Sequence, residues 1–182
     1  MERLIKKGDV LDEPADALIY STNVKLNCSG GVGAVLVARY GQRVQDDLRD
    51  IRDERGRRHV EPGTVIEHVT EGMPYRRVFH TVPVDGWYET SPEIVENVLR
   101  RCLEVCAADP GVASVALSAL ATGYGNLTLK DFLTTAAMVL NDSAYDDIDR
   151  IVIRITGPRF EEAVELITTE SLALETRVLD SE

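Results

Sequence analysis

Short apolar runs alternate with longer amphipathic stretches along almost the whole chain, and this alternation limits the possible fold more than any other feature. The runs Val115-Ala116-Leu117 and Ile151-Val152-Ile153 are uniformly apolar, as expected of interior strands that are covered on both faces. We therefore predict six strands, at Arg3–Lys7, Ala17–Tyr20, Thr64–Val69, Arg77–Val82, Val112–Ser118 and Arg150–Ile155.

The amphipathic stretches between these runs have the periodicity of helices. Ser91 and Pro92 suit the N-cap and the first position of one of them. Six strands and about five helices in this order predict an α/β fold, with a mixed sheet between helical layers. In open sheets of this class a ligand lies beyond the carboxyl ends of the strands. The helices are expected near Val32–Tyr40, Gln42–Arg52, Ser91–Ala108, Thr128–Asn141 and Arg159–Thr169.

Length and charge restrict the domain count and the partners. A chain of 182 residues has room for one substantial core, which we place in residues 1–170, with 171–182 as a C-terminal extension. The spacing of Leu172, Leu174, Val178 and Leu179 in this extension fits either an added strand of the sheet or packing against a neighbour. The formal net charge of -11 opposes a non-specific grip on nucleic acid, which needs clustered cations. The one basic segment, Arg49 to Arg58, is interleaved with acidic residues and is interpreted as a solvated helix end.

Cysteine and hydropathy patterns bear on the compartment. Three cysteines, an odd number, argue against a disulfide framework and favour buried free thiols in a reducing compartment. Cys102 and Cys106 have no further Cys or His ligands nearby, so we expect no metal site. No stretch approaches ~18 consecutive apolar residues. The protein is therefore expected to be soluble and cytoplasmic, without membrane partners.

The first candidate site follows the second predicted strand. Glycines at 30, 31 and 33 remove side chains that would block a ligand. The helix that begins near Val32 would then direct free backbone N–H groups at an anion. The predicted binding residues of this turn are Ser29, Gly30, Gly31, Val32 and Gly33.

A second turn of the same plan follows the fifth predicted strand. It comprises Thr122, Gly123, Tyr124, Gly125 and Asn126, with an aromatic ring between two glycines. Tyr124 can lie against a sugar or the edge of a base. The two turns together predict a clamp for phosphate groups. Neither turn is a Walker loop or a dinucleotide fingerprint, so we expect a diphosphate ligand and no cofactor.

Two polar residues near the predicted strand ends each have a functional and a local interpretation. Asp9, followed by Val10, ends the first strand; it either accepts a hydrogen bond from a base amino group or forms a turn. Asn23 offers a donor and an acceptor suited to ribose hydroxyls, or it caps its own loop. His80, within an apolar strand, is interpreted as a core histidine, and Trp87 as a loop anchor.

These residues resemble one family. The stretches Lys7-Gly8-Asp9, Ala15–Ile19, Asn23 and Gly30-Gly31-Val32, closing on Gly41, are similar to the opening of the macrodomain family. Val78–Val82 is similar to its fourth strand, and Ala119–Asn126 to its second phosphate loop. The resemblance covers about residues 3–170 in the same order.

The resemblance implies a three-layer α/β/α sandwich with a mostly parallel six-stranded sheet that binds ADP-ribose, free or attached to a protein. It implies that Asp9 accepts from the adenine amino group and that Asn23 holds the distal ribose. Gly30–Gly33 and Thr122–Asn126 are implied to cradle the diphosphate. Tyr124 or Gly125 stands where the family places an aromatic residue against that ribose.

Two departures from the family pattern concern catalysis. Tyr20 stands where family members often have Asn, and Gly33 stands where hydrolytic members frequently have an Asp that positions a water. Binding is thus the first hypothesis. The alternative is a hydrolase of ADP-ribosyl or O-acetyl-ADP-ribose esters, with Asn23 as its catalytic residue. A third hypothesis is a site adapted to another nucleotide or RNA end, or a scaffold without a ligand.

Overall fold

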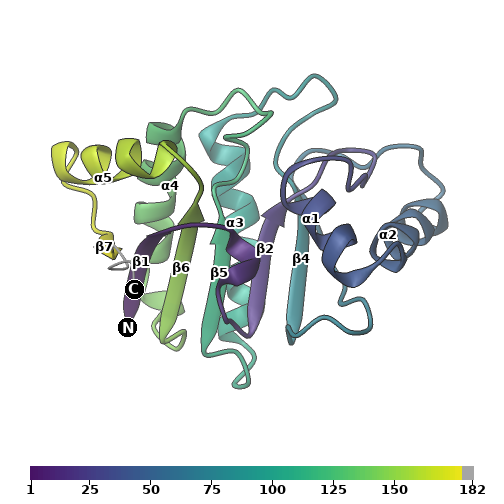
Figure 1. Ribbon diagram of the computed structural model, residues 1–182, viewed down its shortest axis with the longest axis horizontal. Coiled ribbons are helices and arrows are strands. Elements are labelled where there is room, and N and C mark those ends of the chain that lie inside the picture. The colour runs from purple at the N-terminus through teal and green to yellow at the C-terminus, as the bar shows by residue number, and fades with distance from the viewer. Residues whose placement is uncertain (178–182) are drawn as a thin grey trace.

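The computed structural model describes residues 1–177, in which a seven-stranded sheet has the order β3-β4-β2-β5-β6-β1-β7. Every adjacent pair of strands is parallel except β3 and β4, which are antiparallel. Figure 1 shows most of this order directly, from β7 at the left edge to β4 on the right. The strands are β1 (Glu2–Lys7), β2 (Ala17–Ser21), β3 (Thr64–Glu67), β4 (Arg77–Val82), β5 (Ser114–Ser118), β6 (Arg150–Ile155) and β7 (Glu175–Arg177).

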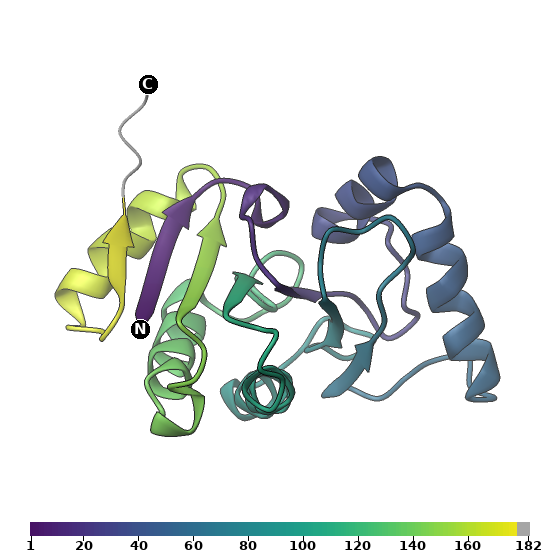
Figure 2. The same cartoon turned by 90° about the horizontal axis from the view of Figure 1, so that it is seen from below.

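Helices cover both faces of the sheet. Figure 2 shows α3 and α4 on one side, and α1 and α2 on the other. The short 3-10 turns η1 and η2 follow β1 and α4 in the chain. The predicted α/β fold with a mixed sheet is therefore confirmed. The helices are α1 (Gly31–Tyr40), α2 (Arg43–Glu54), α3 (Pro92–Ala107), α4 (Leu129–Leu140) and α5 (Arg159–Thr169), and the 3-10 turns are η1 (Val10–Asp12) and η2 (Ser143–Tyr145).

Two buried apolar clusters form the core, one on each face of the sheet. The larger cluster includes Phe79, Leu99 and Phe132, and it joins α3, α4 and α5 to the sheet. The smaller cluster includes Tyr20 and Leu36, and it joins α1 and α2 to the sheet near β2 and β4. Alternate residues of one strand enter different clusters, as the twofold period of a strand requires. Both helical layers are thereby fixed to the strand ends that carry the candidate site.

The structure adds one strand to the six that the sequence predicts. Glu175–Arg177 pairs with β1 in a parallel arrangement and forms the edge of the sheet. Leu174 is buried just before this strand. Two apolar residues of the tail, Val178 and Leu179, lie outside the described residues. The strand is three residues long, and of the two arrangements that the tail pattern left open, it corresponds to an extension of the sheet.

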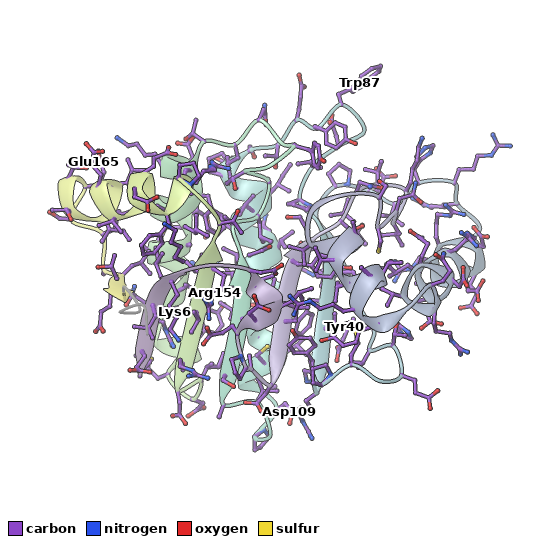
Figure 3. All side chains as sticks on the ribbon, in the orientation of Figure 1. Lys6, Tyr40, Trp87, Asp109, Arg154 and Glu165 are labelled. Atoms are coloured by element: carbon purple, nitrogen blue, oxygen red, sulfur yellow. The ribbon has the colours of Figure 1, made fainter. Side chains whose placement is uncertain are left out.

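Cys28, Cys102 and Cys106 are all buried and free of disulfides, in agreement with the interpretation of the cysteines. His80 is fully buried in β4, which confirms its place in the core. Trp87, by contrast, is 86% exposed and points away from the body of the protein (Figure 3), so the prediction that it anchors its loop is wrong. No helix within residues 1–177 is long and apolar enough to cross a lipid bilayer.

Candidate functional site

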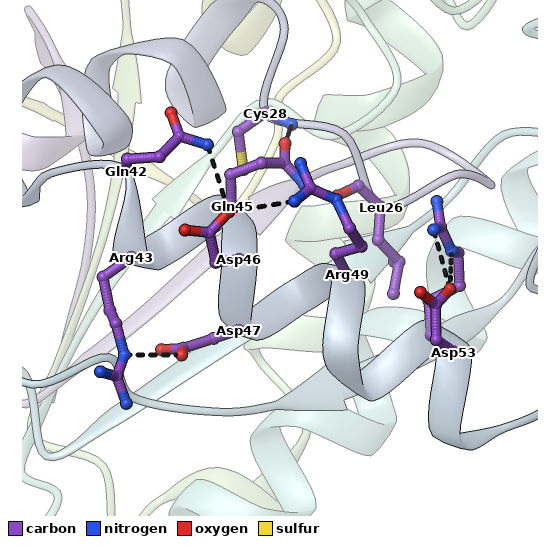
Figure 4. A network of polar contacts seen from close by, with 10 residues as sticks. Leu26, Cys28, Gln42, Arg43, Gln45, Asp46, Asp47, Arg49 and Asp53 are labelled. Carbon is purple, nitrogen blue, oxygen red and sulfur yellow. Dashed lines mark hydrogen bonds and ion pairs between the residues drawn. The ribbon is translucent and has the colours of Figure 1, made fainter.

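The first loop, residues 22–30, leads from β2 into α1 and is held by helix α2 (Figure 4). The Gln45 side chain accepts a 2.7 Å hydrogen bond from the Cys28 N–H and donates a 3.1 Å bond to the Leu26 carbonyl. Leu26 is fully buried and adopts a left-handed backbone with φ of 55°. Such a conformation costs free energy in a non-glycine residue, so the burial and the Gln45 contacts must compensate for it.

Helix α1 begins at this loop with glycines. Gly30 is its N-cap and Gly31 its first residue, and no side chain caps the helix. The first intrahelical donor at this end is Ala34, whose N–H meets the Gly30 carbonyl at 3.3 Å. The N–H groups of Gly31, Val32 and Gly33 precede it, and at a helix N-terminus such groups lack intrahelical acceptors. This end of α1 can therefore bind an anion.

Gly33 is packed where a longer residue would not fit without rearrangement. A Cβ added there would lie 3.0 Å from the Cys28 Cα and 3.3 Å from its Cβ. Cys28 is itself fixed by Gln45. An Asp at position 33 would thus require the first loop to move, so the glycine that replaces the family's Asp fits this chain's own loop.

The second loop, residues 119–128, leads from β5 into α4 and is held mainly by backbone geometry. Ala121 has a left-handed φ of 59°, and its N–H meets the Ser21 hydroxyl at 3.3 Å. A Cβ added to Gly125 would lie only 2.3 Å from the Ala121 carbonyl oxygen. The Thr122 hydroxyl donates to the Ala119 carbonyl at 2.9 Å. Close backbone packing therefore requires glycine at position 125.

Tyr124 joins the two loops. A Cβ on Gly30 would lie 3.0 Å from the Tyr124 hydroxyl oxygen, so the ring covers that glycine at contact distance. Tyr124 is nevertheless 76% exposed, and its ring centroid lies 6.1 Å from that of Tyr88. An exposed ring over a glycine offers one free face for a sugar or a base.

The two loops enclose one cavity of about 620 Å³. This volume lies within the ~300–1,000 Å³ that small-molecule sites commonly have. Twelve of the thirteen residues predicted for the site line this cavity: Asp9, Val10, Asn23, Ser29, Gly30, Gly31, Val32, Gly33, Thr122, Gly123, Tyr124 and Gly125.

The thirteenth predicted residue, Asn126, has a different task. Its N–H donates to the Tyr88 carbonyl at 3.1 Å, and its side-chain oxygen accepts from the Thr90 N–H at 3.0 Å. It thereby ties the second loop to the loop after β4, and it is not among the residues that line the cavity.

Asp9 and Asn23 line the cavity and also hold their own turns. Asp9 is the N-cap of η1, where its carboxylate accepts from the Leu11 N–H at 2.9 Å. The Asn23 oxygen accepts from the N–H groups of Lys25 and Asn27, and its amide donates to the Asn27 carbonyl at 3.0 Å. The functional and the local interpretations of these two residues are thus compatible.

Two arginines that the sequence reasoning missed also line the cavity. Arg159, the first residue of α5, donates to the Thr122 carbonyl of the second loop. A cation at a helix N-terminus is electrostatically unfavourable, and this was the one available signal in the sequence. Arg154, at the end of β6, donates to the Lys7 carbonyl at 2.6 Å and to Glu13 at 2.8 Å.

Glu13 organises the charges beneath Arg154. Its side chain is almost fully buried, and it accepts from Lys6 at 2.9 Å and from Arg154. Burial alone would raise the pKa of Glu13, but the hydrogen bonds from Lys6 and Arg154 outweigh burial and lower the pKa. Glu13 therefore stays ionised, and it is shared by Lys6 and Arg154, with Arg150 at 3.9 Å. Arg159 has the Glu162 carboxylate at 4.0 Å, so both arginines bring positive charge to the cavity.

Tyr20, which stands in place of the family's Asn, points away from the cavity. Its hydroxyl meets His80 Nδ1 in the core, and His80 Nε2 lies 3.0 Å from the His68 carbonyl. Since a carbonyl only accepts, Nε2 carries the proton and the Tyr20 hydroxyl donates to Nδ1. Burial lowers the pKa of His80 to about 4, so the imidazole is neutral. The pair supports the first loop from beneath, where Tyr20 also contacts the Cys28 thiol.

The cavity is poor in groups that transfer protons. Among the described residues that line it, Asp9 is the one carboxylate, and no histidine is present. No cluster of three or more His, Cys, Asp or Glu side chains within residues 1–177 is arranged to hold a metal ion. The arrangement offers backbone donors, a helix N-terminus, an aromatic ring and two arginines, which suits the binding of an anionic nucleotide.

Comparisons with known proteins agree with this geometry. The family model for the Macro domain matches residues 19–137. A Macro domain-containing protein of Streptomyces nogalater is 30% identical over 118 residues, which are 64% of this chain and 65% of that protein, less than two thirds of its length. The human protein mono-ADP-ribosyltransferase PARP14 is 28% identical over 144 residues, 77% of this chain and 8% of that protein.

A solved structure supports the fold. The Oceanobacillus iheyensis macrodomain mutant G37V with ADPR superposes with a TM-score of 0.78 at 19% identity, covering 92% of this chain and 93% of that one. At this identity the likeness concerns the fold alone.

Proposed function

This chain belongs to the Macro domain family, and from that premise we propose that its cavity binds ADP-ribose, either free or attached to a protein. The observation that carries the proposal is the pair of glycine loops that face each other across one cavity. The N-terminus of α1 forms one wall, and Tyr124 reaches across from the second loop to cover Gly30. A diphosphate needs this combination of close backbone approach and N–H donors.

The proposed orientation assigns one part of the ligand to each end of the cavity. The adenine lies at Asp9 and Val10, where a carboxylate accepts from the amino group and an apolar side chain packs on the base. The diphosphate lies between Gly30–Gly33 and Thr122–Gly125, within reach of Arg159. The distal ribose lies near Asn23 and against Tyr124.

A thermal-shift series across ligands tests the identity of the ligand. ADP-ribose, ADP, AMP, NAD and a short oligonucleotide are compared at equal concentration, because a ligand that binds only the folded state raises Tm with its affinity. We expect ADP-ribose to give the largest rise, with ADP next, since ADP lacks the distal ribose. A larger rise with AMP, NAD or the oligonucleotide would contradict the proposal and favour a site adapted to another nucleotide.

Binding without hydrolysis is the form of the function that the geometry favours. Gly33 offers no carboxylate, the Asn23 amide is occupied by its own loop, and Asp9 serves the opposite end of the proposed ligand. We therefore expect O-acetyl-ADP-ribose and an ADP-ribosylated carboxylate to survive incubation with the protein. Mass spectrometry measures the products. If they form faster than in the uncatalysed reaction, the hydrolase alternative is established instead.

A further inference from the structure

A second hollow, of about 350 Å³, lies beside the first loop and is strongly basic. We call it the basic hollow; it is lined by Lys25, Arg52, Asp53, Arg57, Arg58 and His59. Four of these six side chains are Lys or Arg, on a chain whose formal net charge is -11. Such a local reversal of charge is a candidate for recognition of an anionic partner.

Tertiary structure assembles the basic hollow from two segments. Lys25 comes from the first loop, whereas the other residues come from the end of α2 and the segment after it. The Arg52 guanidinium donates to the Lys25 carbonyl at 3.3 Å, and the Val60 N–H donates to the Val24 carbonyl at 2.8 Å. The helix dipole stabilises cations at the C-terminus of α2, but this does not account for Lys25, which lies on no helix.

Part of the positive charge is left uncompensated. Arg52 pairs with Asp53 at 2.8 Å, and Arg57 pairs with Glu61 at 3.2 Å. Lys25 and Arg58 are exposed, and neither has an acidic side chain within ion-pair distance among residues 1–177. These two side chains are free to bind a carboxylate or a phosphate from a partner.

The basic hollow adjoins the end of the cavity at which we place the distal ribose. Lys25 lies between Asn23 and Asn27, both of which line the cavity, and its N–H donates to the Asn23 side chain at 3.0 Å. Two residues of extended chain span at most ~7 Å, so the rim of the cavity and that of the basic hollow share one short stretch of backbone. In the proposed orientation of the ligand, a chain attached to the distal ribose leaves the cavity beside these cations.

We propose that the basic hollow binds an acidic segment of the polypeptide that carries the ADP-ribosyl group. This inference rests on the proposed function, and it specifies the partner as a protein modified next to Asp or Glu residues. An acidic residue two to four positions from the modified one reaches the hollow, because an extended chain advances ~3.3 Å per residue.

The observations favour a short acidic peptide over a long polyanion. The hollow offers two free cations and contains Asp53, and the chain as a whole has a formal net charge of -11. Screening confines attraction to about 10 Å at moderate ionic strength, so the hollow attracts a few carboxylates near it. A nucleic acid or an ADP-ribose polymer extends beyond the hollow, and its further charges are opposed by the net negative charge of the chain.

Calorimetric titrations with ADP-ribosylated peptides test the proposal. Two peptides share the modified residue and differ in carrying acidic or neutral flanking residues, and free ADP-ribose and the unmodified acidic peptide are titrated in parallel. We expect the acidic flanks to tighten binding about tenfold over the neutral flanks in the native protein at moderate salt. The double variant Lys25→Glu/Arg58→Glu should lose this preference while its affinity for free ADP-ribose stays within twofold.

The matched control is Arg55→Glu, which reverses a charge at the end of α2 outside the basic hollow and should keep the preference. Equal affinity for the two peptides, or a preference that persists in the double variant, would overturn the proposal. So would a gain that appears with an ADP-ribose oligomer and not with the acidic peptide. If free ADP-ribose fails to bind, the proposed function falls. In that case the unmodified acidic peptide still tests the basic hollow by itself. Equal affinity of this peptide for the native protein and for the double variant would show that the hollow does not bind acidic segments.

Discussion

The two loops that enclose the cavity reach similar positions by different means. The first loop is held by side chains, through Gln45 of α2, the amide of Asn23 and the buried Leu26. The second is held by its backbone, with Gly125 against the Ala121 carbonyl, and it meets the first through an exposed ring. The comparison indicates a fixed wall that presents N–H donors, and a second wall whose aromatic cover is free to adjust to the ligand.

Gly125→Ala should have the largest effect on stability, because Gly125 is the most closely packed glycine of the second loop. The added Cβ would lie 2.3 Å from a backbone oxygen, which the loop can relieve only by moving. We expect a loss of about 3 kcal/mol in the free energy of unfolding, in the upper part of the range for overpacking. Urea denaturation measures it.

Gly123→Ala is the control for this prediction, since a Cβ at Gly123 meets nothing within 4 Å. Its free energy of unfolding should change by less than about 0.5 kcal/mol. Similar losses in both variants would contradict the distinction between the packed and the open glycine of this loop.

The support beneath the first loop should weaken as the pH falls. The pKa of His80 is about 4 in the folded protein, against 6.5 in an unperturbed histidine. Between these pH values His80 is protonated in the unfolded chain and neutral in the folded protein. The free energy of unfolding therefore decreases as the pH falls from about 7 to about 4. The full loss is about 3 kcal/mol.

Denaturation curves of the native protein and of His80→Gln, recorded between pH 4 and pH 7, isolate this contribution. The variant should show a shallower dependence of unfolding free energy on pH, whatever its absolute stability. An unchanged slope in the variant would mean that His80 does not carry the effect and that its burial is less complete than the structure has it.

Gln45→Ala tests whether side chains hold the first loop. It removes the partners of the Cys28 N–H and the Leu26 carbonyl, at a cost of about 1–2 kcal/mol in stability. ADP-ribose affinity should fall as well, because the glycines at the start of α1 lose their support. Gln42→Ala, which removes only an exposed 3.5 Å contact to Asp46, should change neither quantity.

Tyr124→Ala should have the smallest effect, and only on binding. The ring is exposed, so stability should stay within about 0.5 kcal/mol, while ADP-ribose affinity falls about three- to tenfold. Calorimetry and thermal denaturation together measure the pair of effects. A large loss of stability would show that the ring holds the second loop in place, and that the adjustable wall is in fact fixed.

Local sequence signals predicted most of the fold. The structure reproduces the predicted bounds of Arg77–Val82, Arg150–Ile155 and Arg159–Thr169, because each has an unbroken periodicity and a clear start or stop. The edge strand Glu175–Arg177 was only one of two alternatives for the tail, because its pairing with β1 is a long-range contact that three residues do not encode locally.

The candidate site was predictable where one loop carries several residues and not where distant segments meet. The glycines of both loops line the cavity as expected. Arg154 and Arg159 escaped notice because no motif links the end of β6 to the second loop. The segment Arg49–Arg58 was interpreted as a solvated helix end because acidic residues interleave it, and its proximity to Lys25 is a tertiary contact that the sequence does not show.

The central claim is that the N-terminal glycines of α1 form one wall of an ADP-ribose site, and a calorimetric comparison of two variants tests it directly. Gly31 and Gly72 both have left-handed backbones, with φ of 53° and 91°, and a Cβ at either meets nothing within 4 Å. Gly31→Glu places a carboxylate in the cavity, whereas Gly72→Glu imposes similar strain outside it. We predict that ADP-ribose binds the native protein and Gly72→Glu with similar affinity, and that Gly31→Glu loses at least tenfold. Absence of binding to the native protein, or equal affinity in Gly31→Glu, would contradict the account.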